Sequence, residues 1–221
     1  MAKYKIYLFR HGQTTYNRDK RFTGYRDPLL TPLGISQAKK VAKKLKNKKF
    51  QIAFETKLRR SKETLNQILK YHPECVKIIL DNRMIERNYG DLNGKTHESF
   101  IHNVGKKLVK LEVHGDAYEN LSKADRARIE HFLGEEEYKL IHRGYNVPPP
   151  HGESFAMVES RVGRFIKDLI KLINKEKVNV AISAHGNSIR LFRKIMEKAS
   201  KEKAIKWIIP YDDYYEYTVN V

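Results

Sequence analysis

The chain has 221 residues, of which 40% are apolar and 32% are charged, a composition typical of a folded globular protein and not of a disordered one. No stretch approaches the roughly 20 apolar residues that a membrane-spanning helix needs, and the N-terminus lacks the pattern of a secretion signal, which predicts a cytoplasmic protein without a membrane partner. The formal charge of +18 would suit nucleic acid, an anionic surface, small anionic substrates or solvation alone.

Much of this charge is lysine spread along predicted helices. In residues 39–49, KKVAKKLKNKK, the lysines can occupy one helix face while the other face collects Val41, Ala42 and Leu45. A solvated helix face therefore explains much of the charge, and because no nucleic-acid reading motif is present we expect no nucleic-acid partner. The single cysteine, Cys75, excludes an intrachain disulfide, and we assign it no role.

Strands and helices alternate in the first part of the chain. The spacing of apolar residues predicts a strand over 4–9, a helix over 31–47, a strand over 50–55, a helix that starts near 58 and a strand over 76–80. Thr31 is a suitable N-cap for the first helix, and Pro32 suits its first turn.

The second part of the chain first departs from this alternation and then resumes it. A polar loop at 81–95 is followed by a charged segment of helical pattern over 96–145, which ends before the proline run 148–150. The expected elements after it are a helix over 154–175, a strand over 178–183, another helix and a last strand over 214–221.

This order predicts an α/β fold, a three-layer α/β/α sandwich around a mostly parallel sheet. We expect one domain over 1–221 and interpret 96–145 as a largely helical insertion, or lid, over the carboxyl edge of the sheet. Ligands of such sheets bind beyond the carboxyl ends of the strands. Residues that follow two different strands can therefore meet in one crevice.

Two histidines occupy such positions. His11 and His185 each follow a predicted strand and each precede a glycine. Arg10, directly before His11, and Arg60, at the start of the second helix, could add fixed positive charge. Together these residues predict an anion pocket.

The pocket predicts phosphoryl transfer. Neighbouring cations lower the pKa of an imidazole and keep it neutral and nucleophilic, and they stabilise the charge on a phosphoryl group during transfer. A covalent step at His11 then needs a proton donor for the departing hydroxyl, and Glu86, on the loop after the third strand, is the best-placed carboxyl group. The alternative for Glu86 is an ion pair with Arg83 or Arg87.

These residues lie in segments that resemble a known family. Leu8–Asn17, LFRHGQTTYN, resembles the signature of the histidine phosphatase superfamily, and the wider sequence resembles its cofactor-dependent phosphoglycerate mutase branch. The segments that follow that branch in order are RFTGYRDPLLTPLGISQA (21–38), LRRSKETLNQIL (58–69), MIERNYGDLNG (84–94), HRGYNVPPP (142–150) and AHGNSIR (184–190).

The resemblance implies that His11 becomes phosphohistidine, that Glu86 acts as acid and base, and that Arg10, Asn17, Arg60 and His185 hold the transferred group. The residues implied to contact the rest of the substrate, including its second anion, are Thr23, Gly24, Arg87, Tyr89, Lys95, Arg143, Gly186 and Asn187. It also implies a small phosphorylated substrate, interconversion of 2- and 3-phosphoglycerate in glycolysis and gluconeogenesis, priming by 2,3-bisphosphoglycerate and no metal.

Three features depart from the mutase pattern. His142 and Arg143 stand where mutases usually carry paired arginines, and either Lys95 or His97 takes the place of a substrate-binding lysine. The sequence stops at Val221 without the tail that often closes a mutase site, which leaves 96–145 as the candidate lid; the alternative is a packed surface excursion.

Two other classes of function are alternatives to the mutase. A phosphomonoester hydrolase could use the same residues, since it differs only in admitting water to the phosphohistidine. A basic nucleic-acid-binding module would make the histidines structural. A metal hydrolase is disfavoured, because the nine histidines include no metal-ligand spacing such as HExxH. Homo-oligomerisation is left open by the sequence.

Overall fold

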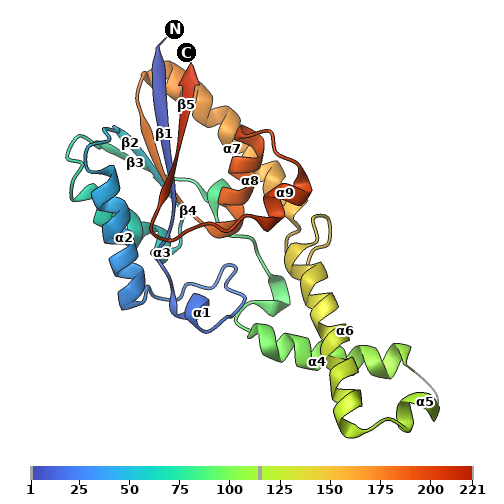
Figure 1. Ribbon diagram of the computed structural model, residues 1–221. Coiled ribbons are helices and arrows are strands. Elements are labelled where there is room, and N and C mark those ends of the chain that lie inside the picture. The colour runs from blue at the N-terminus through green and yellow to red at the C-terminus, as the bar shows by residue number, and fades with distance from the viewer. Residues whose placement is uncertain (1, 114–115, 221) are drawn as a thin grey trace.

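The computed structural model describes residues 2–113 and 116–220 and has a five-stranded sheet at its centre (Figure 1). The strands follow the order β3-β2-β4-β1-β5, and all pairs are parallel except β1 with β5. Their bounds are Lys3–Arg10 (β1), Ile52–Glu55 (β2), Lys77–Leu80 (β3), Val180–Ala184 (β4) and Tyr214–Asn220 (β5). The predicted mostly parallel sheet is confirmed.

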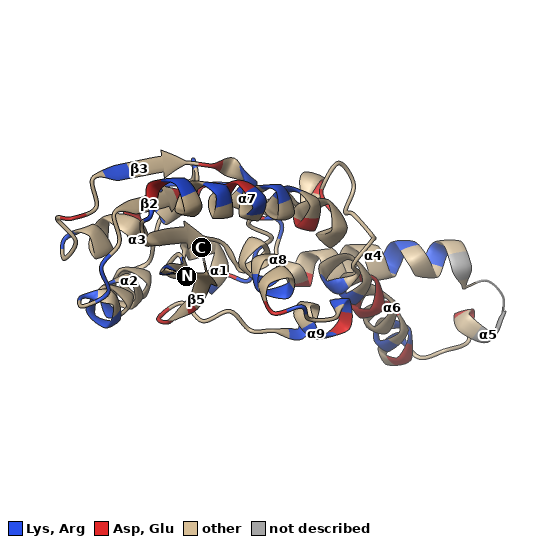
Figure 2. Cartoon of the chain, turned by 90° about the horizontal axis from the view of Figure 1, so that it is seen from above, with Lys and Arg blue, Asp and Glu red and all other residues tan. Residues whose placement is uncertain are grey.

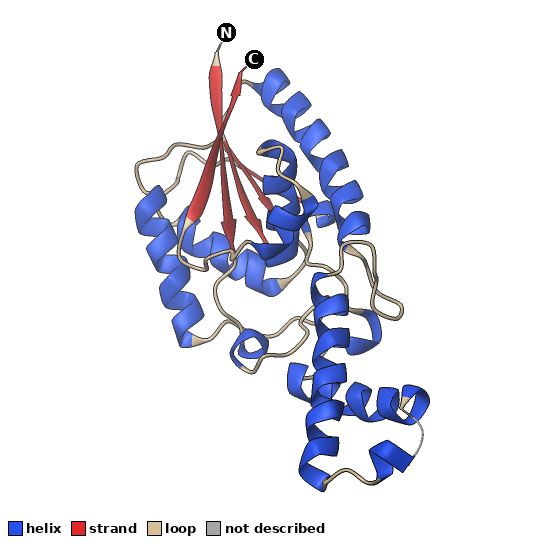
Figure 3. Ribbon diagram, turned by 45° about the vertical axis from the view of Figure 1, so that its right-hand side comes forward, coloured by secondary structure: helices blue, strands red, loops and turns tan. Residues whose placement is uncertain are grey.

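Helices cover both faces of this sheet, as Figure 3 shows. Ile6 and Leu8 of β1 point to the face packed by α7 (Phe155–Glu176) and α8 (Gly186–Met196). The alternate residues of β1 point to the face packed by α2 (Pro32–Leu45) and α3 (Arg59–Leu69). A strand buried on both faces reads as a continuous apolar run, which is why residues 6–9 are apolar throughout.

The helix signals in the sequence are confirmed at α2. The Thr31 side chain accepts a hydrogen bond from the Gly34 amide at 3.0 Å, and Pro32 is the first helical residue. Its apolar face, Val41, Ala42 and Leu45, is buried, while the lysines between them are exposed. Lys and Arg are distributed over many elements and not gathered on one (Figure 2), which agrees with solvated helix faces.

Outside the segment 96–145, the remaining helical elements of the described chain are short. They are α1 (Thr15–Arg18), α9 (Lys201–Lys206) and two 3-10 turns, Asn82–Met84 and Gly90–Leu92. None of the helices in the described ranges is long and apolar enough to cross a membrane.

The segment predicted as a helical insertion forms α4 (His97–Glu112), α5 (Asp116–Glu119) and α6 (Lys123–Arg143). The backbones of α4 and α6 lie so close together that glycine is needed at the crossing. A Cβ on Gly105 would clash with the Glu130 carbonyl oxygen, and one on Gly134 would clash with the Ile101 carbonyl oxygen. The helices meet the body only near the carboxyl edge of the sheet and extend away from it (Figure 1). They flank that edge and do not lie along it.

Candidate active site

The ends of β1 and β4 bring the two predicted histidines together. Arg10 pairs with Ala184 in register, so His11 and His185 leave the sheet side by side, and their ring centroids lie 5.0 Å apart. Arg60, in the first turn of α3, donates from Nε to His11 Nε2 at 3.2 Å and to His185 Nδ1 at 3.3 Å. The structure thus places these three residues in one buried cluster.

The hydrogen bonds of this cluster define which ring nitrogens carry protons. His11 Nδ1 lies 2.7 Å from the Gly12 carbonyl oxygen, which can only accept, so Nδ1 carries the proton and Nε2 keeps its lone pair. His185 accepts from Arg60 at Nδ1, so its Nε2 donates to Thr56 Oγ1 at 2.8 Å. His11 therefore presents Nε2 as a nucleophile.

Both rings are neutral at pH 7. Burial first, and then the charges of Arg60 and Arg10, hold the pKa of His11 well below its usual 6.5. The pKa of His185 is likewise well below 6.5, because of burial and then Arg60 and His11. A neutral imidazole among cations is the state that a nucleophilic histidine requires.

Arg60 is held rigidly enough to orient both rings. It has no exposed surface, and its two terminal nitrogens donate to the carbonyls of Arg26 at 2.7 Å and Gly24 at 2.9 Å. Burial lowers the pKa of Arg60 to about 10, so it stays charged at pH 7. Gly24 has φ +46°, and a Cβ there would lie 1.8 Å from Asn93 Oδ1, so only glycine fits. Gly24, predicted to contact substrate, is not among the residues that line the cavity described below, and its carbonyl holds Arg60.

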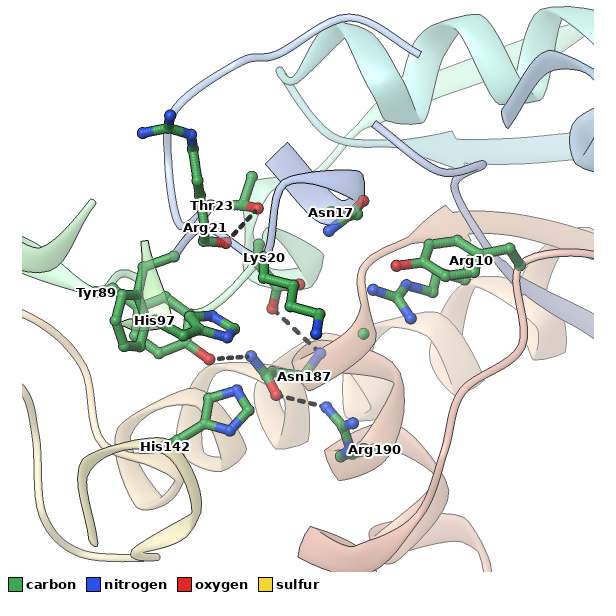
Figure 4. Close-up of a pocket in the computed structure, with 14 residues that line it drawn as sticks. Arg10, Asn17, Lys20, Arg21, Thr23, Tyr89, His97, His142, Asn187 and Arg190 are labelled. Atoms are coloured by element: carbon green, nitrogen blue, oxygen red, sulfur yellow. Dashed lines mark hydrogen bonds between the residues drawn. The ribbon is translucent and has the colours of Figure 1, made fainter. Parts of the chain in front are cut away.

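A cavity of about 220 Å³ opens beside this cluster (Figure 4). Of the residues predicted from the sequence, those that line it are Arg10, Asn17, Thr23, Glu86, Tyr89, Gly186 and Asn187. The other lining residues are Lys20, Arg21, Phe22, His97, His142, Arg190 and Tyr211. Glu86 is the one carboxylate among the lining residues of the described chain, so the cavity is strongly cationic. Its volume is below the roughly 300–1,000 Å³ of drug-sized ligand sites, which suits a small phosphorylated compound.

Glu86 faces the histidines and is not engaged in an ion pair with either arginine weighed above. Its Oε1 accepts from the backbone amides of Arg87 at 2.8 Å and Asn187 at 3.1 Å. One carboxylate oxygen and one ring nitrogen each of His11 and His185 lie within 4.8 Å of one another. Arg83 pairs instead with Asp81 and Asp168, and the guanidinium of Arg87 donates to backbone carbonyls. The Glu86 carboxyl group is thus within reach of a group bound at His11.

The spacing of these three residues could suit a metal ion, but their bonding favours an oxyanion. The guanidinium of Arg60 contacts both His11 Nε2 and His185 Nδ1 and places a positive charge beside these nitrogens, which repels a metal ion. A second cation, Arg10, lies next to them and repels a metal ion further. A phosphoryl group fits the same charges.

Arg10 and its neighbours complete the anion pocket. Arg10 donates to the Ile209 carbonyl at 3.0 Å, and its guanidinium carbon lies 3.8 Å from the centroid of the Tyr211 ring. Its buried Nε has no partner within the described residues, so a donor is left for a ligand. Asn17 Oδ1 accepts from Thr14, which leaves its amide nitrogen to donate. The amino end of α8, at Gly186, adds backbone N–H groups.

Besides Arg60, which lies in the histidine cluster, three cations predicted from the resemblance do not line the cavity. Arg87 is fully buried and donates to the carbonyls of Glu153 at 2.6 Å and Ile141 at 2.7 Å, so it ties the end of α6 to its own loop. Arg143 donates to the Ile205 carbonyl at 2.8 Å, and Lys95 is exposed. The alternative to Lys95, His97, does line the cavity.

The wall formed by the insertion is neutral. Burial, and to a lesser extent Lys20, lowers the pKa of His97 to about 4. Burial, followed by the charges of Arg143 and His97, lowers the pKa of His142 to about 2. The His142 ring stacks on Tyr138 with a centroid distance of 4.9 Å. The imidazole at position 142 therefore supplies no positive charge where a mutase usually has one.

These partly buried histidines predict an acid-sensitive fold. Above pH 6.5 His142 is neutral in both folded and unfolded chains, whereas below it the unfolded chain takes up a proton that the folded chain does not, so stability falls as pH falls. His142→Gln should reduce the loss of unfolding free energy between pH 7 and pH 5 by about 2 kcal/mol. Urea unfolding at both pH values measures this, and equal losses in wild type and variant would contradict it.

Several lining residues were missed by reasoning from the sequence. Arg190 lies in the quoted segment AHGNSIR, three residues after Asn187 and hence on the same helix face, so helical spacing could have indicated it. Lys20 and Tyr211 lie in loops, and Tyr211 reaches the site only because the chain returns to pair β5 with β1. No local pattern signals such a return.

Comparison with known proteins shows the family of the chain. The chain matches the family described as the histidine phosphatase superfamily (branch 1) over residues 6–119 and 111–219. The chain belongs to this superfamily.

Within the superfamily the chain is similar in sequence to proteins named as phosphoglycerate mutases. It is 36% identical to a 2,3-bisphosphoglycerate-dependent phosphoglycerate mutase of Rhizobium meliloti over 91% of this chain and 83% of that protein. It is 30% identical to the protein of the same name from Pseudoalteromonas atlantica, over 86% and 83%.

Solved structures share the fold at lower identity. The alpha-ribazole phosphatase of Shigella flexneri gives a TM-score of 0.70 at 19% identity, covering 96% of this chain and 89% of that one. The phosphoglycerate mutase of Bacillus anthracis gives 0.67 at 19% identity, covering 98% and 88%. The fold thus occurs in both phosphatases and mutases.

Proposed function

We propose that the protein is a phosphoglycerate mutase that interconverts 2- and 3-phosphoglycerate through phospho-His11 and is primed by 2,3-bisphosphoglycerate. The observation that carries the proposal is the neutral Nε2 of His11, held by Arg60 near the Glu86 carboxyl group, beside a small cationic cavity that Glu86 and Arg10 line. The similarity to proteins named as such mutases supports the choice of substrate.

Priming phosphorylates the enzyme. His11 Nε2 attacks a phosphorus of 2,3-bisphosphoglycerate, the bond from phosphorus to the ester oxygen breaks, and that oxygen takes a proton from Glu86. Arg10, Asn17 and Arg60 hold the phosphoryl oxygens during transfer. The positive charge that forms on the ring is stabilised by the Gly12 carbonyl, which accepts from Nδ1–H.

Isomerisation then uses the same groups in both directions. The free hydroxyl of 3-phosphoglycerate gives its proton to Glu86 and attacks the phosphorus of phospho-His11, which forms 2,3-bisphosphoglycerate and frees Nε2. His11 next takes the phosphoryl group from carbon 3, and Glu86 returns the proton to that oxygen. The product is 2-phosphoglycerate, and the enzyme is phosphorylated again.

A phosphomonoester hydrolase is the second candidate, and the shared fold with alpha-ribazole phosphatase favours considering it. In that reaction water, and not a substrate hydroxyl, attacks phospho-His11. Purified protein incubated with 3-phosphoglycerate and a trace of 2,3-bisphosphoglycerate separates the two. Fast formation of 2-phosphoglycerate with little free phosphate supports the mutase, and stoichiometric phosphate release would refute it.

Tyr211 is suited to protect the phosphohistidine from water. Its ring packs on Arg10 and lies 6.4 Å from the His11 ring, which is 1% exposed. Tyr211→Ala should raise the ratio of phosphate released to 2-phosphoglycerate formed, whereas Tyr211→Phe keeps the ring and should leave the ratio near that of wild type. An unchanged ratio in Tyr211→Ala would show that the ring does not exclude water.

The insertion stays a candidate lid. Of the described residues in 96–145, the cavity is lined by His97 and His142, one at each end of the α4–α6 pair. Any gating by this segment would therefore act through the start of α4 and the end of α6, where the rings of both histidines contact the Tyr138 ring.

A further inference from the structure

The cavity contains a cation that the phosphoryl pocket does not use. Arg10 and Arg60 lie at His11, at the reacting end of the site. Of the other cationic lining residues, Arg21 donates to the Gly94 carbonyl at 2.9 Å and its guanidinium points away from the cavity (Figure 4). This leaves Lys20 and Arg190 to face the rest of a substrate.

Arg190 is held in a fixed orientation by neutral groups. It donates from Nε to the Trp207 carbonyl at 2.8 Å and from Nη1 to Asn187 Oδ1 at 2.7 Å. Asn187 in turn contacts Glu86 through its backbone amide. Arg190 therefore lies at a defined place beside the reacting groups, on the side of the cavity toward His142 (Figure 4).

No ion pair neutralises Arg190 within the described part of the chain, although the Glu86 carboxylate partly offsets its charge. No carboxylate there forms an ion pair with it, and burial, together with Arg143 and Arg10, lowers its pKa to about 10. It is still charged at pH 7, and a charge that is partly removed from water gains from an anionic partner. Lys20 extends into the cavity from the opposite side (Figure 4).

We propose that Arg190 binds the second anionic group of the substrate, the carboxylate of a phosphorylated hydroxy acid, and so selects such acids over phosphomonoesters that carry no other charge. His142 is neutral, and Arg143 donates to the Ile205 carbonyl. Arg190 therefore supplies the positive charge for this carboxylate that neither of them supplies. The inference rests on the proposed function for the identity of the acid, but it concerns binding alone.

The test compares two ligands that differ at one group. In sn-glycerol 3-phosphate a hydroxymethyl group replaces the carboxylate of 3-phosphoglycerate. The measurement is calorimetry on His11→Ala protein, which cannot turn over the ligands. It gives the Kd of each ligand for three proteins: His11→Ala alone, His11→Ala combined with Arg190→Met, and His11→Ala combined with Arg164→Met. Arg164 lies on the exposed side of α7, where it bonds Ser160, so its variant removes the same charge away from the cavity.

Arg190→Met should weaken the binding of 3-phosphoglycerate roughly 10- to 100-fold, the range of a hydrogen bond to a charged group. It should change the Kd of glycerol 3-phosphate less than about threefold. Arg164→Met should change neither. Equal weakening of both ligands would overturn the proposal by assigning Arg190 to the phosphoryl pocket or to the support of Asn187, and no weakening of either would overturn it as well.

Arg190→Lys provides a second variant if the methionine substitution unfolds the protein. It keeps a charge but loses the planar fork, so it should weaken 3-phosphoglycerate less than Arg190→Met does and leave glycerol 3-phosphate unchanged. A change shared by both ligands would again refute the assignment. Because this experiment measures no turnover, selective binding of 3-phosphoglycerate would support the role of Arg190 even if the two-product assay showed hydrolysis. Conversely, if the protein is a mutase but Arg190→Met weakens both ligands equally, only the role of Arg190 is refuted and the proposed function is not.

Discussion

His11→Ala is expected to lower kcat by roughly 10⁴- to 10⁶-fold, the scale of losing a covalent nucleophile. The variant removes Nε2, which carries the phosphoryl group, while the Arg60 contacts to Arg26 and Gly24 can persist. Initial rates of 2-phosphoglycerate formation measure the effect. A residual rate within tenfold of wild type would exclude His11 as the nucleophile.

His131→Ala is the matched control. His131 lies on α6 with 65% of its side chain exposed, so the same substitution there removes an imidazole without touching the cavity. Its rate should equal that of wild type. Circular dichroism of both variants shows whether the fold is kept.

Glu86→Gln is expected to lower kcat by roughly 10²- to 10⁴-fold, the range of general acid–base catalysis. The amide oxygen of Gln can still accept from the backbone amides of Arg87 and Asn187, so the site geometry is retained and only proton transfer is lost. The measurement is kcat with 3-phosphoglycerate as substrate.

A second substrate distinguishes proton transfer from binding. The nitrophenolate of p-nitrophenyl phosphate leaves without needing a proton, so phosphorylation of the Glu86→Gln enzyme by this ester should proceed at nearly the wild-type rate in a single-turnover burst. If the variant is slowed equally toward both compounds, Glu86 does not act as the acid and its contribution lies in binding.

The sequence predicts most of the fold because the signals are local. Apolar runs such as residues 6–9, buried on both faces of the sheet, and the capped start of α2 at Thr31 follow from composition and spacing within a few residues. Strand ends differ slightly, since β2 begins at Ile52 and not at residue 50. Hydrophobic burial decides the elements, and the exact ends depend on pairing with neighbours.

The convergence of His11 and His185 could also be predicted, because parallel strands place their carboxyl ends at one edge. The contacts that individual arginines make could not be predicted from the sequence. Arg60 and Arg87 are both fully buried, but one faces the histidines and the other binds the carbonyls at the end of α6. Which carbonyls lie unpaired near a guanidinium is a tertiary property that no local pattern encodes.

The path of the insertion is likewise set by distant packing. Its helical character follows from the sequence, but its direction depends on the close crossing at Gly105 and Gly134. The same packing brings His97 and His142 to the cavity while Lys95, two residues earlier, stays exposed. A shift of two positions therefore decides which of two candidate side chains lines the cavity.

The most direct test of the account is to locate the phosphoryl group on the enzyme. Protein treated with 2,3-bisphosphoglycerate and quenched in alkali, where phosphohistidine is stable, can be examined by ³¹P NMR against the two phosphohistidine isomers, with the residue assigned by peptide mass spectrometry. Because Nδ1 of His11 donates to the Gly12 carbonyl, the account predicts phosphorylation of His11 at Nε2. Phosphorylation at Nδ1, on another residue or on none would contradict it.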